Sequence, residues 1–411
     1  MRRLLFIVVA ALAIAAPAQA SSFAQYGVQD DAWLMYGAGT LDQRIVTLKQ
    51  LGVHVVRLSI RWDQVQPKQA PIAWGQYGVV LDALHAARIP AVVTLWASPR
   101  WANGGNAANH LPTHGFGTFA AAAGRRFPWV RQWTAWNEPN TRVYSVPVSP
   151  SLYVKRVLNP MVAALHAVNH ANKVAGGVTS PRGTSTSMSP LTFLKGMRAA
   201  NAHLDAYAQN PYPGSRTETP FRDPCSWCTT FAMARLPQIR ANVTRYFGAG
   251  KPLWLTEYGY QTSPPDRILG VSPALQAAYV GQAAMRVYRQ SGVTMLIQFL
   301  VRDEPSAAGW QSGVFTTGGT AKPSYRAFGL PLAQVSRSGT RTVLWGQVRP
   351  GSGRRPYVLQ RWNGHGWARV GGTMRTAATG TFQRVVNARA GQKFRIASPV
   401  AAYVSPTLTV S

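Results

Sequence analysis

The feature that most constrains the fold of this chain is a regular alternation of short apolar runs with helical patterns. Apolar runs bounded by turn residues are typical of buried parallel strands. Eight such runs occur, at Trp33–Gly37, His54–Ile60, Ala91–Trp96, Gln132–Trp136, Lys173–Val178, Leu204–Gln209, Pro252–Thr256 and Met295–Leu300. Helical patterns include Leu41–Leu51, Gln76–Arg88, Ser151–Asn169 and Pro273–Gln290, and Ser324–Phe328 begins a last helix. Eight strands alternating with helices over about 310 residues predict an α/β fold, the (β/α)8 or TIM barrel.

A doubly wound parallel sheet is the alternative to a barrel. That fold would want a glycine-rich, phosphate-binding turn after the first strand. The segment Gly37-Ala38-Gly39-Thr40 lacks the third glycine of such a turn. We therefore favour the barrel, in which functional side chains gather at the carboxyl ends of the strands.

The composition changes after about Leu330. Residues 331–411 contain 12 Arg and Lys residues and no Asp or Glu. Short alternating segments separated by Gly-rich turns predict a small β-sandwich there; they are Thr342–Val348, Tyr357–Trp362, Ala368–Val370, Thr381–Val386 and Lys393–Ala397. Its aromatic residues could stack on sugar rings, although packing in the core is their commoner role; they are Trp345, Tyr357, Trp362 and Trp367.

The N-terminus has the features of a secretory signal peptide. Arg2-Arg3 is followed by an apolar run, Leu4–Ala16, and by Ala18-Gln19-Ala20, which fits a cleavage site. The apolar run is too short to span a membrane. We therefore predict a signal peptide at 1–20, a (β/α)8 catalytic domain at 21–330 and a basic β-sandwich accessory domain at 331–411, in a secreted protein without a membrane span.

The formal net charge of the chain is +30. Such a charge attracts polyanions, so an anionic cell-surface polymer is one candidate partner. Biased coding is the alternative explanation, because 35 of the basic residues are Arg and 8 are Lys. No nucleic-acid-binding motif accompanies the charge, so we do not expect nucleic acid as a partner.

Cys225 and Cys228 are the two cysteines of the chain, in the motif Cys-Ser-Trp-Cys. A single CxxC motif can be redox-active, can supply half of a metal site, or can form a local disulfide. In an exported protein we expect the disulfide. His110 and His114 lack a third ligand at suitable spacing, so we expect neither a metal nor a cofactor.

Two of the four glutamates stand where apolar, strand-like runs end. Glu138 lies in Trp136-Asn137-Glu138-Pro139-Asn140, and Glu257 lies in Leu255-Thr256-Glu257-Tyr258-Gly259. Hydrolysis of a glycosidic bond needs two carboxyl groups, one to protonate the leaving oxygen and one to attack or to activate water. The pair therefore points to a glycosidase.

These motifs resemble those of clan A glycoside hydrolases, in particular family 39 or family 5-like enzymes. Further similar segments are Leu51-Gly52-Val53-His54-Val55-Val56-Arg57, Arg61-Trp62-Asp63, Pro99-Arg100-Trp101-Ala102 and Trp310-Gln311-Ser312-Gly313. The resemblance covers about residues 30–330. It implies a retaining enzyme with Glu138 as acid/base after the fourth strand and Glu257 as nucleophile after the seventh.

The resemblance also implies roles for the neighbours of the two carboxyl groups. Asn137 resembles the residue that binds the sugar 2-hydroxyl, Arg57 the arginine that keeps the nucleophile ionised, and Tyr212 the tyrosine beside it. Asn210 stands where relatives often carry His, and Trp96-Ala97-Ser98 lacks a His that family 5 often has. On the same rim, Trp96, Trp101 and Trp310 are candidate sugar platforms.

The sequence thus predicts a secreted, monomeric, retaining β-glycoside hydrolase that acts on a polysaccharide or oligosaccharide. The alternative is a non-catalytic polysaccharide- or cell-envelope-binding protein on a glycosidase scaffold. Asp303 and Glu304 follow the eighth strand and could line the cleft, but we interpret them as solvated loop charges. Asp63 could contact substrate or pair with a nearby arginine.

Overall fold

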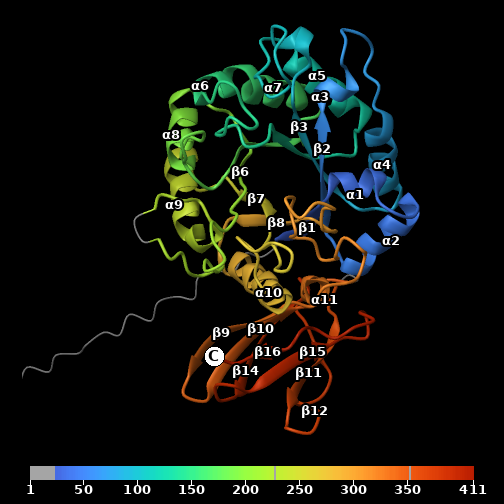
Figure 1. Ribbon diagram of the computed structural model, residues 1–411, viewed down its shortest axis with the longest axis vertical. Coiled ribbons are helices and arrows are strands. Elements are labelled where there is room, and N and C mark those ends of the chain that lie inside the picture. The colour runs from blue at the N-terminus through green and yellow to red at the C-terminus, as the bar shows by residue number, and fades with distance from the viewer. Residues whose placement is uncertain (1–23, 226–227, 351–352) are drawn as a thin grey trace, which may run out of the picture.

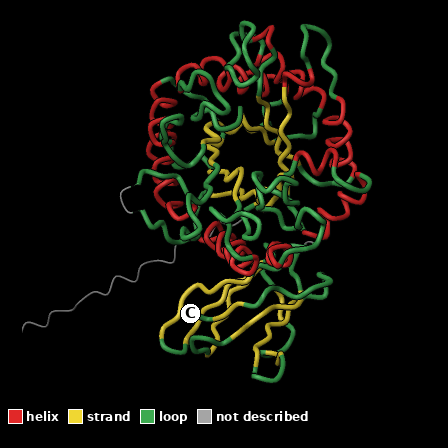
Figure 2. Tube along the Cα trace, viewed as in Figure 1, coloured by secondary structure: helices red, strands yellow, loops and turns green. Residues whose placement is uncertain are grey.

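The computed structural model describes residues 24–225, 228–350 and 353–411. Eight parallel strands form a closed barrel in sequential order, surrounded by helices, as predicted (Figures 1 and 2). The strands are β1 (Gln25–Gln29), β2 (Val55–Arg61), β3 (Ala91–Trp96), β4 (Gln132–Ala135), β5 (Lys173–Thr179), β6 (Ala206–Gln209), β7 (Leu253–Tyr258) and β8 (Val293–Phe299). The predicted signal peptide, 1–20, lies outside the described residues.

The barrel helices occupy the loops that follow the strands. They are α1 (Asp31–Tyr36), α2 (Leu41–Leu51), α3 (Trp62–Val65), α4 (Gly75–Ala86), α5 (Phe116–Arg126), α6 (Pro150–Tyr153), α7 (Asn159–Val168), α8 (Pro190–Ala199), α9 (Leu236–Phe247), α10 (Pro273–Arg289) and α11 (Pro323–Gly329), with short turns η1 (Arg100–Ala102), η2 (Val154–Leu158) and η3 (Met233–Arg235). None of these described helices is long and apolar enough to cross a membrane.

The prediction of the first strand was wrong. Residues Trp33–Gly37 are not a strand but overlap helix α1, and strand β1 lies eight residues earlier, at Gln25–Gln29. Asp30 explains the helix, because its side chain accepts a hydrogen bond from the backbone nitrogen of Trp33 at 3.0 Å and so caps the first turn. Strand β1 approaches β2 closely at Gly27, where a Cβ atom would lie 2.3 Å from the carbonyl oxygen of Val55.

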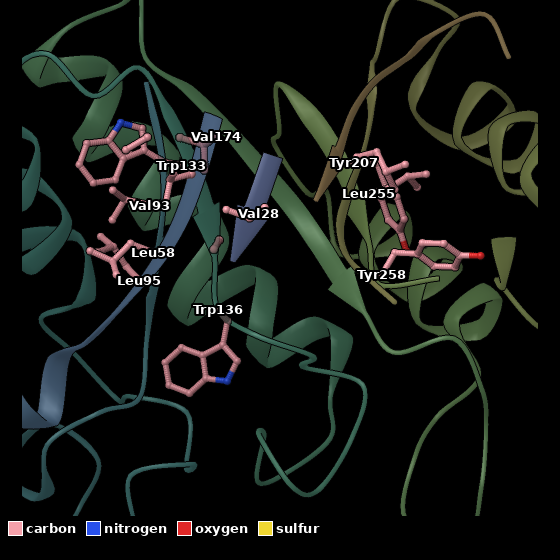
Figure 3. Close-up of a cluster of buried hydrophobic side chains, with 14 of the residues drawn as sticks. Val28, Leu58, Val93, Leu95, Trp133, Trp136, Val174, Tyr207, Leu255 and Tyr258 are labelled. Carbon is pink, nitrogen blue, oxygen red and sulfur yellow. The ribbon is translucent and has the colours of Figure 1, made fainter. Parts of the chain in front are cut away.

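Alternation along the barrel strands separates an inner from an outer core. In β2, Leu58 and Ile60 belong to a large apolar cluster that also contains Val93 and Leu95 of β3 and residues of the barrel helices. Figure 3 shows Leu58, Val93 and Leu95 in this cluster. Val55 belongs instead to a second cluster with apolar residues of β3 and β5–β8. Successive side chains of a strand point to opposite faces, so Arg57 shares the inward face of Val55. The pattern therefore places a charged residue inside the barrel.

Two antiparallel sheets follow the barrel, consistent with the predicted sandwich. One has the strand order β14 (Thr381–Asn387), β10 (Arg341–Gln347), β9 (Leu332–Ser338). The other is formed by β12 (Trp367–Arg369), β11 (Pro356–Trp362), β15 (Lys393–Ala397) and β16 (Leu408–Thr409), with β13 (Met374–Arg375) also paired to β11. The sheets share an apolar cluster, in which Tyr357 stacks on Phe382 with ring centroids 4.0 Å apart.

The three-stranded sheet packs directly on the barrel (Figure 1). Trp345 of β10 is fully buried in the barrel's apolar cluster, and its ring centroid lies 5.5 Å from that of Tyr288 in α10. Beyond β10, the guanidinium of Arg349 lies over the rings of Tyr26 and Phe328, at 4.1 and 4.5 Å from their centroids. This sheet therefore completes the apolar packing of the barrel.

Replacing Trp345 should consequently destabilise the whole barrel. Removing a fully buried tryptophan leaves a cavity and typically costs about 3–5 kcal/mol, so we expect Trp345→Ala to lower the free energy of unfolding by this amount in denaturant titrations. Trp362→Ala is the matched control, because Trp362 is exposed and its removal should cost about 1 kcal/mol or less. Equal losses for the two variants would contradict this interpretation.

Candidate active site

A cavity of about 250 Å³ opens at the carboxyl ends of the barrel strands. Its lining comes from segments at the ends of β1, β2, β3, β4, β7 and β8: Gln29, Asp30, Asp31, Ala32, Ser59, Trp96, Asn137, Tyr144, Glu257, Phe299, Leu300 and Glu304. Functional groups of TIM barrels collect at this end. Glu257 lies in β7, and Glu138 follows β4 by three residues, so both predicted glutamates are at this end of the barrel.

Glu257 is buried, and its carboxylate accepts hydrogen bonds from two side chains. Arg57, which is fully buried, forms an ion pair with its carboxylate, and the Tyr212 hydroxyl donates to Oε2 at 3.0 Å. Burial, followed by the negative charge of Glu257, raises the pKa of Tyr212 well above its usual value, so this hydroxyl keeps its proton. The two carboxylate oxygens of Glu257 thus accept from different donors, one from a guanidinium and the other from a hydroxyl group.

Arg57 also connects the carboxylate to the rest of the barrel interior. Its guanidinium donates to the side chains of Gln29, of Thr94 at 2.9 Å and of Asn137 at 3.1 Å. The last contact turns the amide oxygen of Asn137 toward Arg57, and leaves its amide nitrogen to donate elsewhere. Asn137 lines the cavity, so this nitrogen is suited to bind a hydroxyl group there.

Glu138 has a different environment. The Asn210 amide donates to its Oε1 at 3.1 Å, and the Thr256 hydroxyl fixes that amide by donating to its oxygen at 2.7 Å. Burial and then the negative charge of Glu257 raise the pKa of Glu138 to about 8, against the opposing influence of Asn210 and Arg57. Two carboxyl groups whose environments separate their protonation states are the arrangement expected of an acid and a base in one site.

The backbone around these groups is strained. Five non-glycine residues at or just after the ends of β3, β4, β5 and β8 have positive φ angles: Ala97 (59°), Trp136 (70°), Glu138 (39°), Val178 (50°) and Leu300 (89°). Such conformations are unfavourable for L-residues and persist only where their surroundings enforce them. Here the backbone nitrogen of Glu138 donates to Val178 at 3.0 Å and that of Trp136 to Leu95 at 2.9 Å. The strain fixes the direction in which the Glu138 side chain leaves the barrel wall.

Comparisons with known proteins agree with this geometry. Residues 25–182, which include Glu138, match the model of glycosyl hydrolase family 1. Among curated proteins, none matches the chain in sequence. A family 39 glycoside hydrolase from Bacteroides cellulosilyticus has a similar structure, with a TM-score of 0.62, 14% identity, and coverage of 90% of this chain and 82% of that chain.

Two further structures share the fold. A glucosidase from Croceicoccus marinus has a TM-score of 0.60 at 12% identity, with 92% of this chain and 96% of that chain covered. GH5_18 from Streptomyces cattleya, in complex with GlcNAc, has a TM-score of 0.56 at 17% identity, with 75% and 79% covered. The family match, the closed barrel and the glutamates at its strand ends lead to one conclusion. Over residues 25–182 the chain matches a glycoside hydrolase family, and its barrel has the fold of clan A glycoside hydrolases.

The aromatic residues predicted as sugar platforms have different surroundings in the structure. Trp96 lines the cavity, with its ring centroid 5.6 Å from that of Tyr144. Trp310 packs on Tyr212, with ring centroids 4.8 Å apart, and Tyr212 in turn contacts Glu257. Trp101 instead packs against Trp62 at 5.2 Å, and its indole nitrogen donates to a backbone oxygen at 3.0 Å. Its contacts are those of a structural residue.

Sequence reasoning missed several groups that line the cavity. Gln29 is the last residue of β1 and Asp31 follows that strand, which was predicted too late in the chain; the pattern Tyr26-Gly27-Val28 followed by Asp30-Asp31 was the available signal. Burial raises the pKa of Asp31 to about 7, although Arg57 opposes the shift. Tyr144 lies in the loop after β4, where no sequence pattern distinguishes it.

The two acids after β8 differ from the sequence-based interpretation and from each other. Glu304 lines the cavity and is not only a loop charge; its carboxylate also accepts a hydrogen bond from the Trp310 backbone at 2.7 Å. Asp303 is buried and its carboxylate pairs with the Lys322 ammonium at 2.7 Å.

Asp63, which follows β2, forms an ion pair with Arg61 at 2.7 Å. Asp303 and Asp63 are therefore engaged in structural ion pairs.

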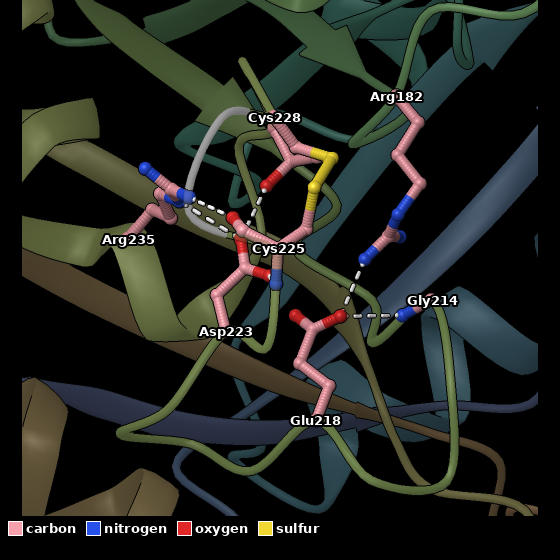
Figure 4. The surroundings of a disulfide bond; sticks show 8 residues. Arg182, Gly214, Glu218, Asp223, Cys225, Cys228 and Arg235 are labelled. Atoms are coloured by element: carbon pink, nitrogen blue, oxygen red, sulfur yellow. Dashed lines mark hydrogen bonds and ion pairs between the residues drawn. A yellow bond between two sulfur atoms is a disulfide. The ribbon is translucent and has the colours of Figure 1, made fainter.

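The loop after β6 carries Tyr212 and the predicted disulfide (Figure 4). Cys225 and Cys228 are joined, with an S–S distance of 2.07 Å. Nearby, Arg182 donates both to the carboxylate of Glu218 at 2.7 Å and to the backbone oxygen of Tyr212 at 2.9 Å. Arg182, held by the buried carboxylate of Glu218, thus fixes the backbone of Tyr212, so the loop stabilises a residue that contacts Glu257. Within the described residues, no cluster of three or more His, Cys, Asp or Glu side chains could hold a metal.

The raised pKa of Glu138 predicts a pH-dependent stability. Between the usual pKa near 4.5 and the native value of about 8, the native state holds a proton that the unfolded chain releases. The stability of the wild-type protein should therefore fall as pH rises through this window. Glu138→Gln cannot titrate, so its stability relative to the wild type should increase from pH 5 to pH 8, by on the order of 3–4 kcal/mol. Urea titrations at the two pH values would measure this; a constant or decreasing difference would contradict the assignment.

Proposed function

We propose that this protein is a retaining β-glycoside hydrolase in which Glu257 is the nucleophile and Glu138 the acid/base. The observation that carries the proposal is the opposite environment of the two carboxyl groups. Glu257 is paired with a buried guanidinium, whereas burial and the charge of Glu257 raise the pKa of Glu138 to about 8. One group is thus suited to attack as an anion and the other to give up a proton near neutral pH.

In the first step, a Glu257 carboxylate oxygen attacks the anomeric carbon as the bond to the leaving oxygen breaks. Glu138 donates its proton to that oxygen, and a glycosyl ester on Glu257 remains. In the second step, the Glu138 carboxylate takes a proton from water, the water oxygen attacks the anomeric carbon, and Glu257 leaves. One water molecule is consumed and both carboxyl groups return to their initial states.

The neighbouring side chains support this chemistry by position. Arg57 and Tyr212 orient the Glu257 carboxylate, since each donates to one of its oxygens. Asn210 orients Glu138, in the position where relatives often carry His. We assign the sugar 2-hydroxyl to the amide nitrogen of Asn137, because Arg57 occupies the amide oxygen. Hydrogen bonds to this hydroxyl strengthen in the transition state of such enzymes.

The substrate that we propose is a polysaccharide or oligosaccharide. Trp96 and Trp310 offer aromatic surfaces at the site, and Asp31 and Glu304 offer carboxylate oxygens that can accept hydrogen bonds from sugar hydroxyls. We further propose that the protein is secreted. The signal-like N-terminus supports this, as does the disulfide, because disulfides persist in oxidising compartments.

The alternative is a non-catalytic polysaccharide-binding protein on this scaffold. Such a protein would have no need to keep Glu138 and Glu257 in contrasting environments with dedicated partners. Turnover distinguishes the two: a screen of aryl β-glycosides and polysaccharides should release product with the wild type and none with Glu257→Ala.

Double displacement makes a specific prediction for the two catalytic variants. With an aryl β-glycoside whose leaving group needs no protonation, Glu138→Ala should still form the glycosyl ester but hydrolyse it about 10²–10⁴-fold more slowly, the typical contribution of acid–base catalysis. Azide needs no general base, so it should restore turnover and yield the β-glycosyl azide. Glu257→Ala should lose hydrolysis of the same substrate, and azide should yield the α-glycosyl azide.

NMR of the products gives the configuration at the anomeric carbon. The wild type should release the β-anomer first. A first product with inverted configuration would contradict double displacement, as would identical azide products from the two variants. Asp303→Asn is not a suitable control, because its buried pair with Lys322 is structural. Asp266→Asn serves instead and should retain full activity, because asparagine keeps the side-chain oxygen that accepts from the backbone of Ile268 and Leu269.

The alkaline limb of the pH–rate profile should report the Glu138 proton. We expect kcat/KM to fall above about pH 8, because the acid is then deprotonated. The Asn210 amide hydrogen-bonds the ionised form and so lowers the pKa of Glu138. Asn210→Ala should therefore move the alkaline limb to higher pH while reducing the maximal rate. A shift to lower pH would contradict the assigned contact.

A further inference from the structure

We propose that the outer face of the five-stranded C-terminal sheet binds a polysaccharide whose sugars carry carboxylate groups. This face lies on β11, β12, β13 and β15, and the β11–β12 hairpin lies at the end of the molecule away from the barrel (Figure 1). The surface is separate from the catalytic cavity. The proposal therefore does not rest on the proposed catalytic residues.

Strand alternation defines which side chains share this face. Tyr357 and Leu359 of β11, and Phe394 and Ile396 of β15, are buried in the core between the two sheets. The intervening residues must point to the opposite, outer side. In β11 these are Pro356, Val358, Gln360 and Trp362, and in β15 they are Lys393, Arg395 and Ala397.

Cross-strand pairing brings these residues into rows. Gln360 is paired with Arg369 of β12 on one side and with Arg395 of β15 on the other, so one polar row crosses three strands. Neighbouring strands are about 4.8 Å apart, which places the two arginine positions of this row roughly 10 Å from each other. The Arg395 guanidinium donates to Gln360 at 2.7 Å, which fixes its direction.

A tryptophan pair forms the next row of the same face. Trp362 and Trp367 are direct cross-strand partners, with ring centroids 5.6 Å apart at an angle of 64°. Arg395 covers Trp367 at 4.3 Å, whereas 38% of the Trp362 surface is exposed. The other two aromatic candidates, Trp345 and Tyr357, are at most 1% exposed and belong to the core. The structure thus separates a surface pair from core aromatics.

The charge of this face is positive throughout. Arg369, Arg375 and Lys393 are exposed, and pairing of Arg375 with Pro356 puts it on the outer side as well. Residues 331–411 contain no Asp or Glu, and among the described residues every ion pair between side chains lies in the barrel. A carboxylate-bearing ligand would supply the missing counter-charge.

The combination of groups favours an acidic polysaccharide over other polyanions. A guanidinium matches a carboxylate with two parallel hydrogen bonds, and an exposed indole ring offers an apolar platform for the face of a sugar ring. The sheet is attached to a barrel that resembles glycoside hydrolases, so a sugar polymer is the ligand that both parts of the chain would meet. Single-stranded nucleic acid also combines charge with stacking, and an anionic membrane offers charge alone, so both are included as tests.

The test uses the chain without its signal peptide, residues 21–411, and polygalacturonate as the probe. Affinity is measured by titration calorimetry at low and at physiological salt, next to fully methyl-esterified polygalacturonate, single-stranded DNA and vesicles containing phosphatidylserine. We expect binding to polygalacturonate that weakens as salt rises, because salt screens exposed charges over about 8–10 Å. Binding to the neutral ester should be at least tenfold weaker.

Three variants locate the binding surface. Trp362→Ala with Trp367→Ala removes the aromatic pair, and Arg369→Gln with Arg395→Gln removes two charges of the outer face; each should weaken binding at least tenfold. The matched control, Arg341→Gln with Arg384→Gln, removes two exposed charges from the three-stranded sheet and should change the affinity less than twofold. Melting temperature and hydrolysis of an aryl glycoside verify folding. If the tryptophan variant is unstable, the single charge reversal Arg369→Glu replaces it.

Several outcomes would overturn the proposal. Absence of binding at low salt would do so, as would equal loss in the control variant, which would show attraction by net charge alone. Equal affinity for the neutral ester would exclude recognition of the carboxylate. Tighter binding of DNA or of vesicles, lost in the same outer-face variants, would assign the surface to a different partner. Truncation at residue 330 is unsuitable, because Trp345 completes the barrel core.

Discussion

The buried guanidinium of Arg57 is the group on which the site depends. A charge without solvent access is stable only when it is paired and its donors are satisfied. Arg57 meets this condition through Glu257, Gln29, Thr94 and Asn137. These partners come from strands β1, β3 and β7 and from the loop after β4, so one side chain links four parts of the barrel wall. The barrel closes around a charge that forms an ion pair with the carboxylate of Glu257.

The same requirement explains why the two glutamates differ. Glu257 takes the available cation, and Glu138 is left beside a negative charge with only a neutral amide as its hydrogen-bonding partner. The raised pKa of Glu138 therefore arises first from its burial and then from the negative charge of Glu257, whereas the ion pair with Arg57 belongs to Glu257 alone. The positive φ angles after β3, β4 and β8 show that the backbone is held in unfavourable conformations where these groups are presented, as is common at functional sites.

Long, strongly patterned elements could be predicted from the sequence, and local ones could not. Seven of the eight barrel strands and helix Leu41–Leu51 follow from apolar periodicity, because burial on both faces leaves a continuous signal. Strand β1 was predicted at the wrong place, because Trp33-Leu34-Met35-Tyr36 is as apolar as a buried strand. This segment forms a helix because the Asp30 side chain caps its first turn. Because of this error, Gln29 and Asp31 were not predicted to line the cavity. Strand β9 was missed because its second half, Ser336-Arg337-Ser338, is polar and exposed.

Candidate residues that follow a strand could be located, whereas those presented by loops could not. Glu138, Glu257, Arg57 and Asn137 have positions determined by the barrel itself. Tyr144 reaches the cavity through the path of a loop, for which no periodic pattern exists. The choice between Trp96 at the cavity and Trp101 in the packing likewise depended on loop geometry, because both follow the same strand-end rule.

Charge is divided in this molecule between an acidic cavity and a basic exterior. The chain has 13 acidic residues and a net charge of +30, yet Asp30, Asp31, Glu257 and Glu304 all line one cavity. Like charges repel strongly where water is excluded, so an acidic sugar would be disfavoured in the cavity and attracted to the C-terminal sheet. If both proposed sites operate, they therefore select different sugars. The sheet would hold the enzyme on an acidic polymer that the barrel does not cleave, and hydrolysis would act on a neutral glycan of the same surroundings.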